Sequence, residues 1–151
     1  MKLILALFIS RAIAASTGTI TLSGTVPAST NITVTPQSGY NSLNLATGAS
    51  NLLVATVTEQ NNTAAGYSVT LASANNGDLK HPSIGGVPYS ASYANVPVTL
   101  STTPVTITSQ GAQLGVVNVT KDLKITFTGQ SPATLVQGVY SDTLTFTITS
   151  N

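Results

Sequence analysis

Hydrophobic and polar side chains alternate with a period of two along most of the chain after residue 16. This alternation is typical of β-strands, because successive side chains of a strand point to opposite faces of its sheet. It predicts strands over residues 18–26, 31–35, 52–58, 66–72, 96–100, 105–108, 114–119, 123–128 and 139–149. Clusters of turn-forming residues separate these segments, at 60–63, 75–78, 85–86 and 129–132. Short strands joined by such turns predict an all-β protein with a β-sandwich architecture and little helix.

Composition agrees with this prediction. Of 151 residues, 42% are hydrophobic and only 6% are charged, while 25 are Thr and 17 are Ser. Hydroxyl and β-branched side chains suit both faces of a sheet, so the polar surface is built largely without charge. The hydrophobic content is too high for a disordered chain, and the lack of a basic patch argues against nucleic acid as a partner. The length is that of a single domain.

Residues 1–15 have the pattern of a secretory signal peptide. Lys2 precedes an apolar run, and small residues in an A-x-A arrangement follow it. An amphipathic segment that stays attached is the alternative, because Arg11 interrupts the pattern. Cleavage would leave three Lys, three Asp and one Glu, a net charge of 3 − 4 = −1. No later apolar run is long enough for a transmembrane segment, so we expect an exported protein that relies on its core, since it has no Cys.

The inventory of reactive side chains is small. The chain has one histidine, His81, and outside the signal peptide only four carboxylates: Glu59, Asp78, Asp122 and Asp142. A His81-assisted serine hydrolase and a calcium site in the turn at 75–78 are the candidates. The first lacks a motif around any Ser, and the second lacks the spaced acids of a dedicated calcium loop. We therefore predict no enzyme, and no catalytic, cofactor-binding or metal-binding residues.

A carbohydrate-binding surface is the main alternative function. Tyr40, Tyr89 and Tyr93 lie in loop-like sequence, and tyrosine rings can stack on sugars. Under this interpretation the protein is a self-complete, secreted β-sandwich that binds a glycan and serves in adhesion.

The two ends of the chain carry a more specific signal. Near its C-terminus, Gly138, Tyr140, Asp142 and Leu144 form a Gly-x-Tyr-x-Asp-x-Leu pattern, and an alternating segment spans residues 18–26 near the N-terminus. In these features the chain resembles the chaperone–usher pilus subunits, both the archaic branch related to spore coat protein U and the alpha-type fimbrial major pilins. It differs from the archaic branch in having no Cys and in ending Thr149-Ser150-Asn151 without an aromatic residue.

The resemblance implies an incomplete immunoglobulin-like β-sandwich over residues 27–151, completed by a donated strand from another copy. Residues 16–26 would be the donor strand, with Gly18, Ile20, Leu22, Gly24 and Val26 on the inserted face. The acceptor groove would lie beside the final strand, at Tyr140, Leu144, Phe146 and Ile148. The implied protein is a fimbrial subunit at the cell surface, acting in adhesion or biofilm formation. Its implied partners are other copies, a periplasmic chaperone during transit and an outer-membrane usher.

Alternation alone leaves a second possibility open. Residues 18–26 are also compatible with the first strand of a sandwich that is complete within one chain. The two possibilities differ in whether this segment contacts its own domain.

Overall fold

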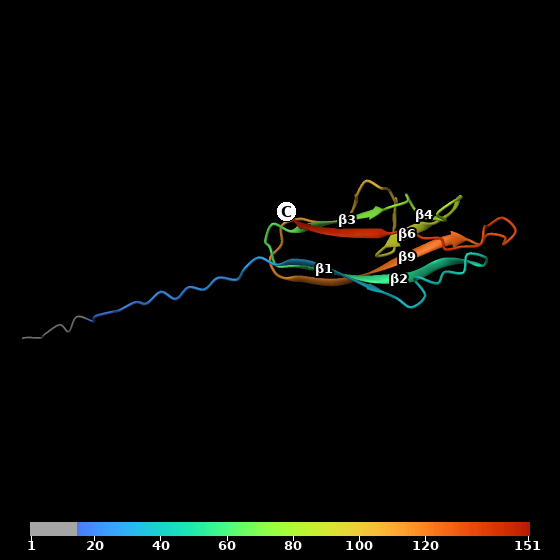
Figure 1. Ribbon diagram of the computed structural model, residues 1–151. Helices are drawn as coiled ribbons and strands as arrows, with labels where there is room; N and C mark the ends of the chain where they lie inside the picture. The colour runs from blue at the N-terminus through green and yellow to red at the C-terminus, as the bar shows by residue number, and fades with distance from the viewer. Residues whose placement is uncertain (1–14) are drawn as a thin grey trace, which may run out of the picture.

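The computed structural model describes residues 15–151, which form ten β-strands and no helix (Figure 1). The predicted signal peptide, apart from Ala15, lies outside the described residues. One antiparallel sheet has five strands, in the order β1 (Thr30–Pro36), β2 (Gly48–Asn61), β9 (Val117–Thr128), β6 (Ser90–Tyr93) and β7 (Val96–Val98). The other has three, in the order β10 (Leu144–Ser150), β3 (Tyr67–Ser73) and β8 (Val105–Gln110). A small hairpin joins β4 (Asp78–Lys80) to β5 (Gly86–Pro88).

The two sheets form two layers with the hydrophobic core between them (Figure 1). Alternation produces this arrangement directly: in β3, Tyr67, Val69 and Leu71 are buried, and the residues between them are less so. Val57 of β2 and Leu123 of β9 contribute from the opposite layer. The predicted all-β, sandwich-like architecture is therefore confirmed. Among the described residues there is no helix long and apolar enough to cross a membrane.

Most predicted strands are found, with four differences. The segment 18–26 is wrong as a strand, because it pairs with no other part of the described chain. The segments 114–119 and 123–128 are wrong as separate strands, because β9 runs unbroken through the polar residues between them, all paired with β2. The final strand begins at Leu144, later than the predicted 139. The alternation also missed β4, β5 and β6, which have only three or four residues each.

The strand directions define two ends of the molecule. At the proximal end, β1 begins at Thr30 and β10 ends at Ser150; Asn151 donates its backbone N–H to Gly66 there. At the distal end lie the turn after β3, the β4–β5 hairpin and the loops at 37–47 and 129–143. Strands β1 and β10 therefore run in opposite directions. Residues 15–29 leave the proximal end as an extended segment that projects away from both sheets (Figure 1).

Candidate functional site

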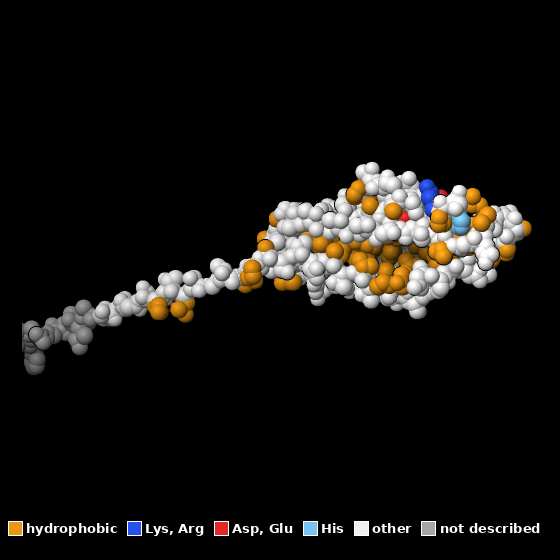
Figure 2. All heavy atoms as spheres, in the orientation of Figure 1, with side chains coloured by type: hydrophobic (Ala, Val, Ile, Leu, Met, Phe, Trp, Pro, Cys, Tyr) orange, Lys and Arg blue, Asp and Glu red, His pale blue; other side chains and the backbone are white. Residues whose placement is uncertain are grey.

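The extension, residues 16–29, belongs to no strand within the described part of the chain. Its side chains all face solvent, and Ile20, Leu22 and Val26 are 84%, 85% and 86% exposed. Gly18 and Gly24 have no other part of the described chain within 4 Å of where a Cβ would stand. All five predicted donor residues are thus exposed, as the space-filling view shows for the projecting segment (Figure 2), and of the five only Val26 borders a hollow of the domain.

Asn62, in the turn after β2, holds the root of the extension. Its side-chain oxygen accepts the Ser29 N–H at 2.6 Å, and its side-chain nitrogen donates to the Pro27 carbonyl at 3.0 Å. Its backbone N–H donates to the Ser29 carbonyl at 3.1 Å. Three hydrogen bonds to one residue fix the direction in which the extension leaves the domain.

An apolar groove opens between β1 and β10, which are the outer strands of their sheets. Each pairs with a neighbour along one edge only, β1 with β2 and β10 with β3. Figure 2 shows the apolar side chains exposed between the two layers on this side. The groove has a volume of about 290 Å³, and its apolar lining includes Val34, Pro36, Val54, Leu79, Leu123, Ile125, Leu144 and Phe146. It combines a hydrophobic floor with two unpaired strand edges, which is the environment that an added strand requires.

The structure brings two of the four predicted groove residues to this opening. Leu144 and Phe146 line it, and Ile148 follows on the same face of β10, half-buried. Tyr140 lies outside β10, in a hollow at the distal end, with its ring 5.2 Å from that of His81. The reason is that Ser141 pairs with Lys80 of β4, through two backbone hydrogen bonds of 3.0 Å, before the chain turns into β10.

Asp142, the acid of the C-terminal pattern, fixes the start of β10. Its carboxylate accepts hydrogen bonds from the Ser73 hydroxyl at 2.5 Å and the Tyr89 hydroxyl at 2.7 Å. It also accepts the backbone N–H groups of Asn75 at 3.0 Å and Thr143 at 2.7 Å. Burial, followed by the bond to Asp142, raises the pKa of Tyr89. The acid thus ties the distal end of the groove to the turn after β3.

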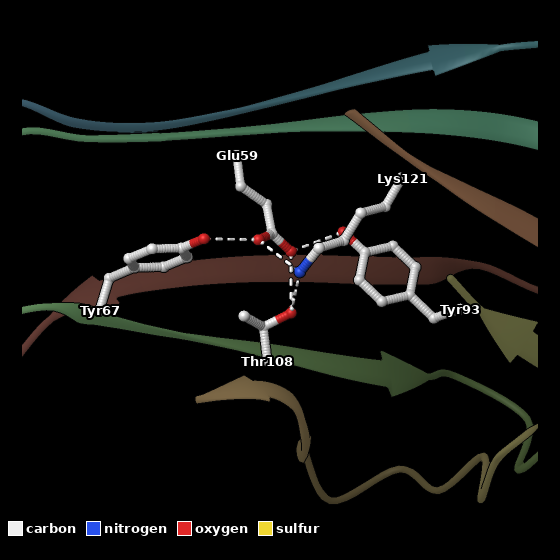
Figure 3. A network of polar contacts seen from close by, with 5 residues as sticks. All are labelled: Glu59, Tyr67, Tyr93, Thr108 and Lys121. Atoms are coloured by element: carbon white, nitrogen blue, oxygen red, sulfur yellow. Dashed lines mark hydrogen bonds and ion pairs between the residues drawn. The ribbon is translucent and has the colours of Figure 1, made fainter. Parts of the chain in front are cut away.

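A charged cluster spans the space between the layers nearer the proximal end (Figure 3). Glu59 of β2 is fully buried and accepts hydrogen bonds of 2.7–2.9 Å from four side chains. They are Tyr93 and Lys121 of its own sheet and Tyr67 and Thr108 of the other. Lys121 also donates to Thr108 at 2.8 Å, so the cluster joins the two sheets.

Titration behaviour follows from these contacts. Burial alone would raise the pKa of Glu59, but the hydrogen bonds from Lys121, the two tyrosines and Thr108 outweigh it, and the pKa lies below its ordinary value of 4.5. Burial, with the bond to Glu59, raises the pKa of Tyr67 to about 12 and raises that of Tyr93 as well. Glu59 is therefore a charged group inside the protein that is fully satisfied by its neighbours.

The cluster was not anticipated from the sequence, although a signal for it exists. Val57, Glu59 and Asn61 are in phase along β2 and all buried, so the alternation that placed Val57 inside also placed the carboxylate there. The predicted strand over 52–58 ended one residue too early to include it.

The other candidate sites are not assembled. Tyr93 is buried in β6 and Tyr89 is bound to Asp142, so of the three predicted sugar-stacking rings only Tyr40 is largely exposed. His81 accepts a hydrogen bond from the Ser83 backbone at 3.2 Å in the β4–β5 turn. Residues 15–151 contain no group of three or more His, Cys, Asp or Glu side chains placed to hold a metal ion.

Comparison with known proteins adds no relationship: no family model matches the chain, and no curated protein matches it significantly.

Proposed function

We propose that this protein is a pilin, a structural subunit of an extracellular fimbria, and that it polymerises by donor-strand exchange. The observation that carries the proposal is a complementary pair on one chain: an extension with alternate apolar residues in solvent, and a domain with an open apolar groove. In this proposal the fold is an immunoglobulin-like sandwich that lacks one strand. The extension of a neighbouring copy supplies that strand.

The root of the extension favours insertion into another copy over insertion into the same chain. To reach its own groove, the extension would have to reverse at residues 27–29, where Asn62 directs it away. An extension that continues outward instead enters the distal end of the next domain and runs antiparallel to β10. Such a strand is parallel to β1, and repetition of this step produces a linear fibre.

The energetics also favour donation. Burying Ile20, Leu22 and Val26 contributes about 1.5–3 kcal/mol for each side chain. The donated backbone pairs with the free edges of β1 and β10, and glycines at 18 and 24 allow close approach where a pocket is shallow. Dissociation must break all of these contacts together, so we expect it to be slow.

The remaining parts of the proposal follow from the hazard of an open groove. An apolar groove flanked by unpaired edges promotes aggregation. We therefore propose that a periplasmic chaperone covers it after export, that an outer-membrane usher assembles the fibre, and that the fibre acts at the cell surface in adhesion or biofilm formation.

The decisive experiment exploits the period of two. In Leu22→Asp a charge lies on the proposed inserted face, whereas in Thr21→Asp the same charge lies one residue away on the other face. We expect SDS-resistant ladders from the parent chain and from Thr21→Asp, and none from Leu22→Asp. Deletion of residues 16–25 should likewise leave a domain that folds with its chaperone and does not polymerise. A parent chain that stays monomeric when purified alone, or equal ladders from both Asp variants, would refute the proposal.

A further inference from the structure

The proximal end of the domain carries a second apolar surface, separate from the groove. The loop between β8 and β9 exposes Leu114 completely and Val116 at 78%. The Gln113 backbone N–H holds this loop to the Ala64 carbonyl at 3.0 Å. Together with the root of the extension, the loop encloses a hollow of about 450 Å³, lined by residues that include Val26, Ala28, Asn62, Gln113, Leu114 and Val116. Exposed apolar groups gathered around a hollow indicate an interaction surface.

The spacing between the extension and the domain determines what must lie next to this hollow. This step rests on the proposed function, in which Val26 is the last donor residue. Only residues 27–29 separate Val26 from the first residue of β1. Four Cα-to-Cα steps span at most about 14 Å when fully extended. Because Asn62 also holds Pro27 and Ser29, the next domain is brought against the proximal end.

The distal end offers a matching surface beside the point where a donor strand would enter. Val139 is 76% exposed, and it lines a hollow with Tyr40 and Leu43, next to the start of β10. Val136 is exposed in the same loop. These side chains flank the path of the donor on one copy, as Leu114 and Val116 flank it on the other.

We infer that the loop at 113–116 and Asn62 form a second contact between copies, in which the proximal hollow of one subunit receives the distal loop at 136–139 of the next. The occupant is another copy of this chain. The contact adds apolar burial at each junction and restricts rotation about the three-residue linker. It thereby sets the stiffness of the fibre, whereas the donated strand sets its cohesion.

Cysteine pairs test this contact directly, because the chain has no cysteine of its own. The variant Leu114→Cys/Val139→Cys is assembled, oxidised, boiled to dissociate donated strands and run without reductant. Leu114→Cys/Val96→Cys is the matched control, since Val96 is a similarly exposed valine on β7, at the far edge of the five-stranded sheet. We expect at least roughly tenfold more reductant-sensitive covalent multimers from the first pair, because the junction holds its thiols at high effective concentration.

The outcomes separate this inference from the proposed function. Polymers that cross-link no better than the control overturn the second contact and leave donor-strand exchange intact. A parent chain that forms no polymer overturns both. A cysteine-independent measurement covers variants that assemble poorly: fibres of Leu114→Ser/Val116→Ser should have a persistence length shorter by about twofold, and those of Val96→Ser should not. Unchanged stiffness in the first variant also overturns the inference.

Discussion

The space between the two sheets is filled in its proximal part and open nearer the distal end. Around Glu59, the proximal part is filled by a charged group whose partners all come from the same chain. Between β1 and β10, the part nearer the distal end is an apolar opening bordered by unpaired edges. In the first region a charged group is buried, which is energetically unfavourable unless it is paired, and here the Glu59 carboxylate is fully hydrogen-bonded. The second is made of Val, Leu, Ile and Phe, which close-pack readily in protein cores, and it remains open.

The two regions therefore have different roles: the Glu59 cluster stabilises the domain, and the groove, in the proposed function, serves assembly. The Glu59 cluster joins the sheets without help, so it holds the domain in one arrangement whether or not the groove is filled. The groove, in the proposed function, takes its missing strand from another copy. In that proposal the opening beside Val34 of β1 and Leu144 of β10 is present before a donor arrives.

Filling the groove within one chain should produce the largest effect. Residues 16–26 can be moved from the N-terminus to follow Asn151 through a short turn, since Asn151 ends next to the open side at the proximal end. The appended strand would run antiparallel to β10. We expect a monomer whose unfolding free energy exceeds that of the donor-deleted domain by several kcal/mol, with three side chains at about 1.5–3 kcal/mol each.

Denaturant unfolding of both proteins measures this difference. An appended strand that carries Leu22→Asp is the matched control and should give only a small gain. If the intact and the charged strand stabilise the domain equally, the groove is not an acceptor.

Breaking the charged cluster should be the next largest change. Glu59→Ala leaves the Lys121 ammonium and two tyrosine hydroxyls without their acceptor, and we expect a loss of about 3–5 kcal/mol in unfolding free energy. The double variant Glu59→Leu/Lys121→Met removes both charges, so it should recover a large part of that loss. Chemical denaturation of the donor-deleted domain isolates the effect from polymerisation. A loss no larger than that of an ordinary surface substitution would show that the cluster does not hold the sheets together.

Asp142→Ala should have a smaller effect, at the boundary of the groove. It removes the acceptor of Tyr89 and of the fully buried Ser73, and we expect a loss of about 2–3 kcal/mol, since each unsatisfied group costs about 1–3 kcal/mol. Tyr89→Phe, which removes a single donor, is the graded control at about 1 kcal/mol. Both are measured by denaturant unfolding. If Asp142→Ala lost no more unfolding free energy than Tyr89→Phe, the other three donors to the Asp142 carboxylate would contribute nothing measurable.

The pH dependence of the cluster should be the mildest signature. A carboxyl whose folded-state pKa lies below its unfolded value of 4.5 contributes stability above that value and loses it as the pH falls through the folded pKa. The parent domain should therefore lose stability below about pH 4.5, by about 1.4 kcal/mol for each unit of pKa difference. Glu59→Gln should reduce this loss of stability at acid pH, as measured by thermal unfolding from pH 7 to pH 2. An equal loss of stability at acid pH in the parent and in Glu59→Gln would contradict a charged, hydrogen-bonded Glu59.

The sequence predicts the elements of this fold better than their lengths. Period-two alternation identified the long strands because the core needs every second residue. It failed where pairing overrides pattern, as in β9, where the polar residues around Asp122 continue a strand because β2 lies beside them. Strands of three residues, such as β4 and β5, are too short for alternation to detect.

The candidate site was predictable in part. Alternation identified which residues of 18–26 share a face, but that pattern could not say whether the segment would pack on its own domain. Tyr140 was misplaced because Ser141 pairs with β4, a strand that the sequence had not revealed. The Glu59 cluster required knowledge of which strands face one another, and that information is in the topology and not in any local pattern.

The shared location of the chain's C-terminus and the root of the extension has a practical consequence for labelling. Asn151 donates its side-chain N–H to Gln110 beside the β8–β9 loop, so a fusion placed after it would lie in the proposed junction and obstruct end-to-end growth. The β6–β7 hairpin lies instead at the edge of the five-stranded sheet, with its tip beside the middle of β9, and its tip residues Ala94 and Asn95 are exposed in left-handed turn geometry. An epitope inserted there would decorate the flank of every subunit along a growing filament.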